Sequence, residues 1–327
     1  MEGIYKMKKW LTSGLLLVLA LLVLSACGGN DKEDENNQEE ANANNEAETE
    51  EVEELEELTV QFVPSQNADT LEAKAKPLEE LLSEELGIDI TVSVSTDYNT
   101  IVEAMKSDQV DVGFLPPTAY VLAHDQDAAD VILQAQRYGV NDDGSPTEEL
   151  VDSYKSMFIV RADSDIETIE DLKGKKIGYQ NVTSSAGFVW PAATLMEADI
   201  HPLEDMEPVT LKGHDQAIIS LLNKDIDVAV TFQDARNVLA SDYETVFEDT
   251  RVLEFTEPIP NDTIAVRPGI SDEMKDKITA AFIAIGEDPE GQEIIRDIYS
   301  HEGYVESQDS NFDIVRDYEE KVSKEVN

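Results

Sequence analysis

The chain has 327 residues and a formal net charge of −47, from 71 acidic and 24 basic residues. So large a negative charge argues against nucleic acid and anionic membrane surfaces as partners, because both would repel it. Cysteine occurs once, so the chain cannot form an internal disulfide.

The N-terminus is typical of an export signal. Three lysines at positions 6–9 precede an apolar stretch, residues 11–24, that is too short for a comfortable membrane span. The following Leu-Ser-Ala-Cys-Gly, residues 24–28, resembles a lipobox, which implies a lipid on Cys27. We therefore expect residues 1–26 to be a lipoprotein signal peptide. With Cys27 lipidated, no thiol remains for catalysis.

A strongly acidic segment follows. Residues 31–57 contain 14 acidic residues and one lysine, with almost nothing to bury. This composition predicts that residues 27–57 form a disordered, self-repelling tether that holds the folded part near the membrane. Beyond Glu57 there remain about 270 residues, enough for two lobes, with 56 acidic and 20 basic side chains and a net charge of −36.

From Leu58 onward, predicted strands and helices alternate, as in a parallel sheet with helical crossovers. Gly87 is a good helix C-cap. The first series comprises strands 58–63, 88–94 and 110–114 and helices 70–86, 99–107 and 119–124.

A second alternation starts near Ser156. Pro191 falls inside a predicted helix, so we expect an irregular start there. The series comprises strands 157–161, 176–179, 209–211, 228–232 and 262–267, and helices 185–198, 215–223, 271–285, 289–299 and 312–322.

Extended crossings near residues 157 and 258 divide these two series. They predict an α/β fold with two lobes, residues 58–156 plus 261–327 and residues 157–260, each with a mainly parallel sheet flanked by helices. A ligand cleft is expected between the lobes, beyond the carboxyl ends of the strands.

The hydroxyl cluster Thr183-Ser184-Ser185 follows strand 176–179 and precedes a helix. A helix start presents unpaired N–H groups and a positive dipole end, and three hydroxyls add neutral donors, which favours an anion site. An ordinary N-cap is the alternative, because Ser and Thr are preferred caps.

Four segments together resemble the substrate-binding proteins of phosphonate, phosphite and phosphate ABC importers. They are residues 96–98 (Thr-Asp-Tyr), 114–120 (Phe-Leu-Pro-Pro-Thr-Ala-Tyr), 183–187 with Pro191, and 213–215 followed by 227–234. Their order and spacing agree with this family from about Leu58 to Tyr318. The resemblance implies a two-lobed periplasmic-binding fold of type II, with two crossings, that closes on a small phosphorus oxyanion and delivers it to a permease. It implies no enzyme activity, no cofactor and a monomer.

The resemblance also implies ligand-binding residues. They are Tyr98, Tyr120, Thr183, Ser184, Ser185, His214 and Asp234. Asp227 is an alternative to Asp234, which could accept a proton held by the ligand, and a protonated His214 would balance the charge.

Simpler roles remain open for each of these residues. The two tyrosines could be packing residues, and His214 and Asp234 could cap helices. Arg137 and Arg236 are expected in surface or hinge salt bridges. Gln180, Asn181 and Gln233 are expected near the mouth of the cleft.

Other functions are weighed on the same residues. A receptor for another oxyanion or a small organic ligand is the first alternative. A secreted hydrolase using Ser184 or Ser185 with His214 lacks the Gly-x-Ser-x-Gly elbow. The four histidines are scattered without metal-site spacing, so no metal is expected.

Overall fold

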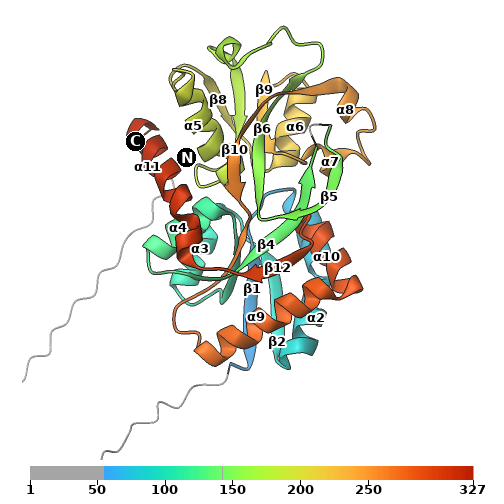
Figure 1. Cartoon of the computed structure of the whole chain (residues 1–327), viewed down its shortest axis with the longest axis vertical. Coiled ribbons are helices and arrows are strands. Elements are labelled where there is room, and N and C mark those ends of the chain that lie inside the picture. The colour runs from blue at the N-terminus through green and yellow to red at the C-terminus, as the bar shows by residue number, and fades with distance from the viewer. Residues whose placement is uncertain (1–54, 142, 327) are drawn as a thin grey trace, which may run out of the picture. The chain divides into compact units, whose positions relative to one another are not determined.

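The structure is a computed structural model that describes residues 55–141 and 143–326. These residues form two α/β lobes, each built around one β-sheet (Figure 1). The predicted signal peptide, Cys27 and all but the last residues of the predicted tether lie outside the described residues. Within residues 55–141 and 143–326, no helix is long and apolar enough to span a membrane.

The first lobe contains a seven-stranded sheet. Its strands are Glu57–Phe62 (β1), Asp89–Val94 (β2), Val112–Leu115 (β3), Asp130–Val140 (β4), Pro146–Val151 (β5), Thr263–Val266 (β11) and Gly303–Glu306 (β12). They lie in the order β2-β1-β3-β11-β4-β12, and β5 pairs with the last residues of β4.

The second lobe contains a five-stranded sheet. Its strands lie side by side in the order β10-β6-β9-β7-β8. They are Ser153–Arg161 (β6), Lys176–Tyr179 (β7), Glu207–Thr210 (β8), Val228–Phe232 (β9) and Thr250–Pro260 (β10). The strand β6 begins at Ser153, ahead of the predicted lobe boundary at 156/157.

Both sheets are mixed, which differs from the expected mainly parallel sheets. Strand β1 is parallel to β2 and β3, and β7 is parallel to β8 and β9. The remaining pairs are antiparallel, because the strands next to the crossings enter and leave each lobe in opposite directions. The sequence also predicts no strand at β4, β5 or β12, although β4 pairs with three other strands of the first sheet.

Helices flank both sheets. In the first lobe they are Ala68–Ala75 (α1), Pro77–Leu86 (α2), Tyr98–Lys106 (α3), Pro117–Asp125 (α4), Asp272–Glu287 (α9) and Pro289–Tyr299 (α10). In the second they are Ile169–Leu172 (η1), Ser185–Val189 (η2), Trp190–Glu197 (α5), His214–Leu222 (α6), Arg236–Leu239 (α7) and Val246–Asp249 (α8).

Two local predictions can be compared with these helices. The single helix expected over residues 70–86 is divided into α1 and α2, because Pro77 starts a new helix at its first position. It ends as predicted at Gly87, which adopts a left-handed φ of 72° and donates its N–H to Ser83. The irregular start expected from Pro191 is confirmed, since the wide turn η2 precedes α5.

The two crossings lie side by side between the lobes. Asn261 donates its backbone N–H to Asp152 over 2.8 Å. Its side-chain amide donates to the carbonyls of Ala135 and Val151, both over 2.9 Å. One buried asparagine therefore joins both crossing segments to the end of the first sheet.

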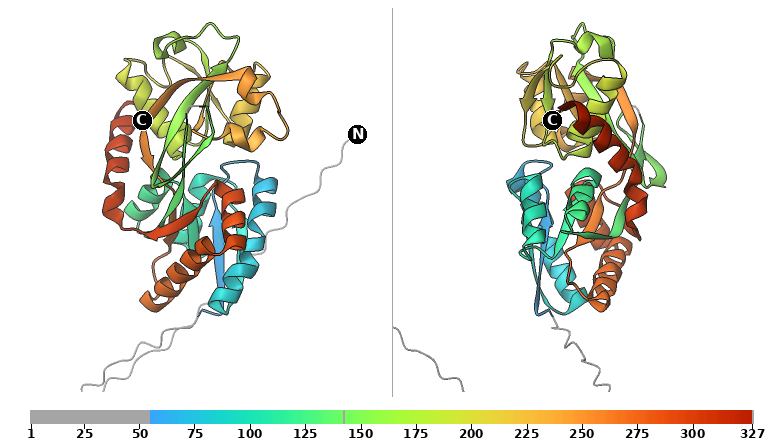
Figure 2. Two further views of the ribbon diagram at one scale, coloured as in Figure 1. Left: turned by 45° about the vertical axis from the view of Figure 1, so that its right-hand side comes forward. Right: turned by 90° about the vertical axis from the view of Figure 1, so that its left-hand side faces the viewer.

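The last segment contacts both lobes. It consists of Asp309–Phe312 (η3) and Asp313–Val326 (α11), and α11 packs against α4 of the first lobe and α5 of the second. Figure 2 shows α11 running alongside both lobes. The rings of Trp190 and Tyr318 stack 4.4 Å apart at an interplanar angle of 9°. The predicted assignment of residues 261–327 to the first lobe therefore does not describe the packing of α11.

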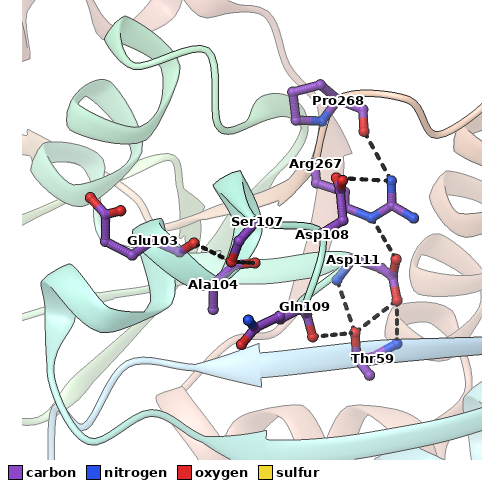
Figure 3. Close-up of polar contacts among 9 residues, drawn as sticks. All are labelled: Thr59, Glu103, Ala104, Ser107, Asp108, Gln109, Asp111, Arg267 and Pro268. Carbon is purple, nitrogen blue, oxygen red and sulfur yellow. Dashed lines mark hydrogen bonds and ion pairs between the residues drawn. The ribbon is translucent and has the colours of Figure 1, made fainter. Parts of the chain in front are cut away.

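A polar cluster ties β1, β3 and β11 together (Figure 3). One oxygen of Asp111 accepts hydrogen bonds from the backbone N–H and the hydroxyl of Thr59, over 2.8 and 2.7 Å. The other oxygen accepts from Nε of Arg267 over 2.8 Å. Nη1 of Arg267 donates to the Pro268 carbonyl over 3.0 Å. Both oxygens of Asp111 and two nitrogens of Arg267 thus have hydrogen-bond partners within the cluster.

Candidate ligand-binding site

A cavity of about 40 Å³ lies between the lobes, room for a few water molecules or a compact ion. It lies beyond the carboxyl ends of β1, β3 and β9, as expected for an α/β fold. Its polar lining consists of Ser65, Gln66, Tyr98, Arg137, Asp262 and Tyr299 from the first lobe, and Tyr154, Ser184 and His214 from the second.

Ser184 is both the N-cap of the turn η2 and a wall of the cavity. Its Oγ accepts the N–H of Gly187 over 3.1 Å, and its own N–H donates to the Asn181 carbonyl over 2.8 Å. A Cβ on Gly187 would lie 1.9 Å from Oε1 of Gln180 and 2.7 Å from Oγ of Ser184, so only glycine fits this turn. Ser184 is therefore an N-cap, as in the alternative interpretation of the sequence, and the same capping geometry places this residue at the cavity.

The two neighbouring hydroxyls do not line the cavity. Oγ1 of Thr183 donates to Oδ1 of Asn181 over 2.8 Å, within its own loop. Oγ of Ser185 contacts the backbone N–H and the hydroxyl of Thr118 over 3.0 and 2.9 Å. Ser185 therefore joins the second lobe to α4 of the first, while Thr183 shapes the loop.

The two predicted tyrosines occupy different environments. Tyr98 is the first residue of α3, lines the cavity, and its hydroxyl interacts with Ser184 of the opposite lobe. The Tyr120 hydroxyl instead donates to Asp309 over 2.9 Å, and its ring packs edge-on against Phe312. Burial raises the pKa of both phenols, so each remains a neutral donor. Tyr120 is a packing residue that anchors η3.

His214 is the first residue of α6 and lines the cavity. Its backbone N–H donates across the cleft to the carbonyl of Ser65 over 2.9 Å, and its ring packs edge-on against Phe232. Among the described residues, Nδ1 is buried without a hydrogen-bond partner. Burial lowers the pKa of His214 to about 3, which favours a neutral imidazole over the protonated form expected from the sequence.

Asp234 faces an arginine rather than the cavity. Nη2 of Arg137 donates to both carboxylate oxygens over 3.1 Å, and Arg137 lines the cavity in its place. The expected salt bridge of Arg137 is confirmed, but its side chain is buried and not at the surface. Asp227 lies at the other end of β9, where it accepts the backbone N–H of Lys176 over 2.9 Å. It cannot be the cavity carboxylate.

Residues 60–312 match the family described as ABC transporter, phosphonate, periplasmic substrate-binding protein. The chain belongs to this family. Its members are substrate-binding proteins and not enzymes, so the hydrolase alternative is excluded.

Two relatives agree with this assignment. The phosphate-import protein PhnD of Mycolicibacterium smegmatis is 30% identical over 221 residues, which are 64% of this chain and 62% of that protein. The phosphonates-binding periplasmic protein of Escherichia coli is 25% identical over 242 residues, 73% of this chain and 69% of that protein. The matched part thus spans less than two thirds of the length of the mycobacterial relative.

Solved structures of similar fold include two binding proteins. A phosphonate transporter component from Pseudomonas aeruginosa gives a TM-score of 0.71 at 20% identity and covers 82% of this chain and 87% of that one. PhnD1 from Prochlorococcus marinus, solved with methylphosphonate, gives 0.71 at 14% identity and covers 82% and 99%. These likenesses establish the two-lobed periplasmic-binding fold.

The cavity contains a carboxylate that the sequence did not indicate. Asp262 follows the second crossing directly and lines the cavity. Among the described residues, its Oδ1 is buried without a hydrogen-bond partner, and Oδ2 lies 3.7 Å from Nε2 of His301. An acidic residue two positions after the Pro-Ile-Pro crossing at residues 258–260 was the available signal. Ser65 and Gln66 were missed too, because they lie in the loop after β1.

The amide side chains expected at the mouth of the cleft have defined roles. Nδ2 of Asn181 donates to Oδ2 of Asp97 in the other lobe over 2.9 Å, beside a surface groove that shares Gln66 and Tyr98 with the cavity. Gln180 is buried behind Gly187. Gln233 donates to the Val140 carbonyl over 2.7 Å. Among the described residues, no group of three or more His, Cys, Asp or Glu side chains is placed to hold a metal ion.

Proposed function

We propose that this protein is an extracytoplasmic solute-binding lipoprotein of an ABC importer. It captures a small phosphorus oxyanion (a phosphonate, phosphite or phosphate) between its lobes and delivers it to the permease. The observation that carries this proposal is that Tyr98 from one lobe and Ser184 and His214 from the other line a single small cavity. Family membership supports the extracytoplasmic location and the partnership with a permease.

The donor set suits a buried oxyanion. An anion removed from water is costly unless its oxygens accept hydrogen bonds. Tyr98 and Ser184 offer hydroxyls, and neutral His214 offers one ring N–H. Because these donors come from both lobes, the ligand is fully bound only when the cleft is closed. That coupling is what an importer needs to distinguish loaded from empty receptors.

Asp262 favours a ligand that brings a proton. An ionised carboxylate only accepts hydrogen bonds, and Oδ1 of Asp262 lacks a donor among residues 55–141 and 143–326. A P–OH group would satisfy it, whereas sulfate or methanesulfonate would leave two acceptors face to face. We therefore expect phosphorus oxyanions to be preferred over sulfur oxyanions of similar size.

Titration calorimetry tests the proposal directly, using methylphosphonate, phosphite, hypophosphite and phosphate, with sulfate and methanesulfonate as comparison ligands. At least one phosphorus oxyanion should bind with a Kd well below about 1 mM. Tyr98→Phe should weaken that binding about tenfold, because it removes a donor to a charged ligand. Tyr120→Phe removes the same hydroxyl away from the cavity and is the matched control. Failure of every phosphorus ligand to bind would refute the proposal and favour a receptor for a different solute.

The lipid anchor on Cys27 is a separate part of the proposal. It rests on the apolar segment and the Leu-Ser-Ala-Cys-Gly sequence alone. Mass spectrometry of the protein extracted from membranes should find a diacylglyceryl-modified N-terminal Cys27. Cys27→Ser should release the protein from the membrane fraction without changing ligand affinity, and a variant that remains membrane-bound would contradict the anchor.

A further inference from the structure

Arg137 is the one lysine or arginine among the described residues that line the cavity. It lies on β4 and its side chain is only 7% exposed. A buried guanidinium needs both a counter-charge and partners for its five N–H groups. How many of these groups the protein uses therefore indicates what else Arg137 can bind.

The protein fixes the Arg137 guanidinium but leaves part of it without hydrogen bonds. Nη2 donates to both oxygens of Asp234 over 3.1 Å. The guanidinium carbon lies 5.3 Å from the centre of the Tyr154 ring and 5.9 Å from that of Phe232. Nε and Nη1 have no hydrogen-bond partner within residues 55–141 and 143–326, while both rings and Arg137 itself line the cavity. Two donor nitrogens are therefore available to a ligand.

The charges around the cavity require such a cation. Asp262 lines it with a carboxylate, and His214 is held neutral by burial. Without Arg137, an incoming oxyanion would meet only neutral donors and a negative charge. Asp234 holds Nη2 of the Arg137 guanidinium, so the ligand meets the arginine rather than the carboxylate of the pair.

We propose that Arg137 is a ligand-binding and specificity-determining residue, which supplies the cation of the site and selects compact phosphorus oxyanions that carry no ammonium group. This inference rests on the proposed function. An aminoalkyl phosphonate brings its own cation, which Arg137 would repel. Asp234 is already bound by Nη2 and could not pair with that cation, and Asp262 is the acceptor for the P–OH group of the same ligand.

Arg236 provides a matched control. It is a second buried arginine, two residues beyond Asp234, and its guanidinium lies 4.6 Å from the centre of the Phe247 ring. It does not line the cavity. Replacing Arg236 therefore removes a buried positive charge near the same turn without removing a donor from the ligand.

The experiment is calorimetry of the folded protein with methylphosphonate and 2-aminoethylphosphonate. Wild type should bind methylphosphonate at least about tenfold more tightly. Arg137→Gln should weaken methylphosphonate binding about 10- to 100-fold, the loss of a charge-assisted hydrogen bond. It should also shift the ratio of the two affinities at least tenfold toward 2-aminoethylphosphonate, because Asp234 becomes free to pair with the ammonium group. Arg236→Gln should leave both affinities within about twofold.

A double variant keeps the test valid if Arg137→Gln alone fails to fold. Arg137→Gln with Asp234→Asn removes both charges and keeps an amide pair, and it should lose methylphosphonate affinity without gaining 2-aminoethylphosphonate. Unchanged affinities in these variants, or a wild type that prefers 2-aminoethylphosphonate, would overturn the role of Arg137 while leaving the proposed function intact. A wild type that binds no phosphorus oxyanion would instead refute the proposed function itself.

Discussion

Two arginine–aspartate pairs of similar burial show how differently one interaction can be used. Arg267 and Asp111 have side chains 16% and 11% exposed, and Arg137 and Asp234 have side chains 7% and 12% exposed. In the first pair, each partner also bonds outside the pair: Oδ2 of Asp111 accepts from Thr59, and Nη1 of Arg267 donates to Pro268 and Asp108 (Figure 3). In the second, a single nitrogen makes both hydrogen bonds.

The difference separates a structural pair from a ligand-binding one. The Arg267–Asp111 pair joins three strands and has little left to offer a solute. In the Arg137–Asp234 pair, Nη2 alone makes the hydrogen bonds to the carboxylate, and the arginine lines the cavity. Unused donors in a buried pair, more than the pair itself, mark a binding site.

The largest expected effect comes from breaking the structural pair. Asp111→Ala leaves Arg267 and the backbone N–H of Thr59 without their acceptor, so the free energy of unfolding should fall by about 3 kcal/mol. Urea unfolding measures this loss. Ligand affinity of the protein that remains folded should be unchanged, in contrast to Arg137→Gln. Equal losses of ligand affinity in the two variants would erase the distinction between the structural and the ligand-binding pair.

A fall in pH should have the next largest effect, and it should act on the cavity rather than on the Asp111 cluster. The reason is that His214 lines the cavity, whereas the cluster of Asp111, Thr59 and Arg267 contains no histidine. Burial lowers the pKa of folded His214 to about 3 from the ordinary 6.5. Protonation therefore favours the unfolded chain, and stability is lost as the pH falls from about 6.5 toward 3, by about 1.4 kcal/mol per pH unit. Unfolding of wild type and His214→Gln, compared at pH 6.5 and 4.5, should show the smaller loss in the variant. Identical pH dependence would contradict it.

A glycine at the cleft should affect mainly closure. A Cβ on Gly213 would lie 2.5 Å from Oδ1 of Asp215, which would have to turn aside, and 3.1 and 3.2 Å from backbone atoms of Gln66 in the other lobe. Gly213→Ala should therefore hinder closure and weaken ligand binding about tenfold, with little change in unfolding free energy. Gly303→Ala is the control, because a Cβ there meets nothing within 4 Å. Unchanged affinity in Gly213→Ala would show that the lobes do not need this close approach.

The smallest expected effect is on the rate of ligand association, and it comes from the remote carboxylates of the chain rather than from Arg137. The net charge of −36 beyond Glu57 should slow the approach of an anion at low salt, whereas Arg137 acts only at contact. The association rate constant should rise a few-fold between about 0.02 and 0.3 M salt, as the remote carboxylates are screened. Stopped-flow fluorescence would measure it, and a rate that falls with salt would contradict this account.

Local signals predicted much of the fold. Gly87 ended its helix, Pro191 distorted the start of its helix, and four motifs in register indicated the family. The sequence did not predict β4, although Arg137 lies on it, because its pairing with β11 and β12 joins segments more than a hundred residues apart. Strand pairing over such distances leaves no local signature.

The site was predicted only in part for a related reason. Tyr98 and Tyr120 both lie in the first turn of a helix, and the sequence treats them alike. Tyr120 is turned to Asp309, which is 189 residues further along the chain. Asp234 follows β9 as the resemblance implied, yet its carboxylate forms an ion pair with Arg137. Which side chain faces the cavity depends on partners that the local sequence does not reveal.

The helix α11 has a consequence for the lifetime of the bound state. It contacts α4 in one lobe and α5 in the other, through the Trp190–Tyr318 stack. A rotation that separates the lobes has to break either the contacts of α11 with α4 or the Trp190–Tyr318 stack, and the two rings lie outside the lining of the cavity. We therefore expect the residence time of a bound solute to depend partly on contacts of α11 that do not touch it. Release could be tuned in evolution at this contact while recognition stays the same.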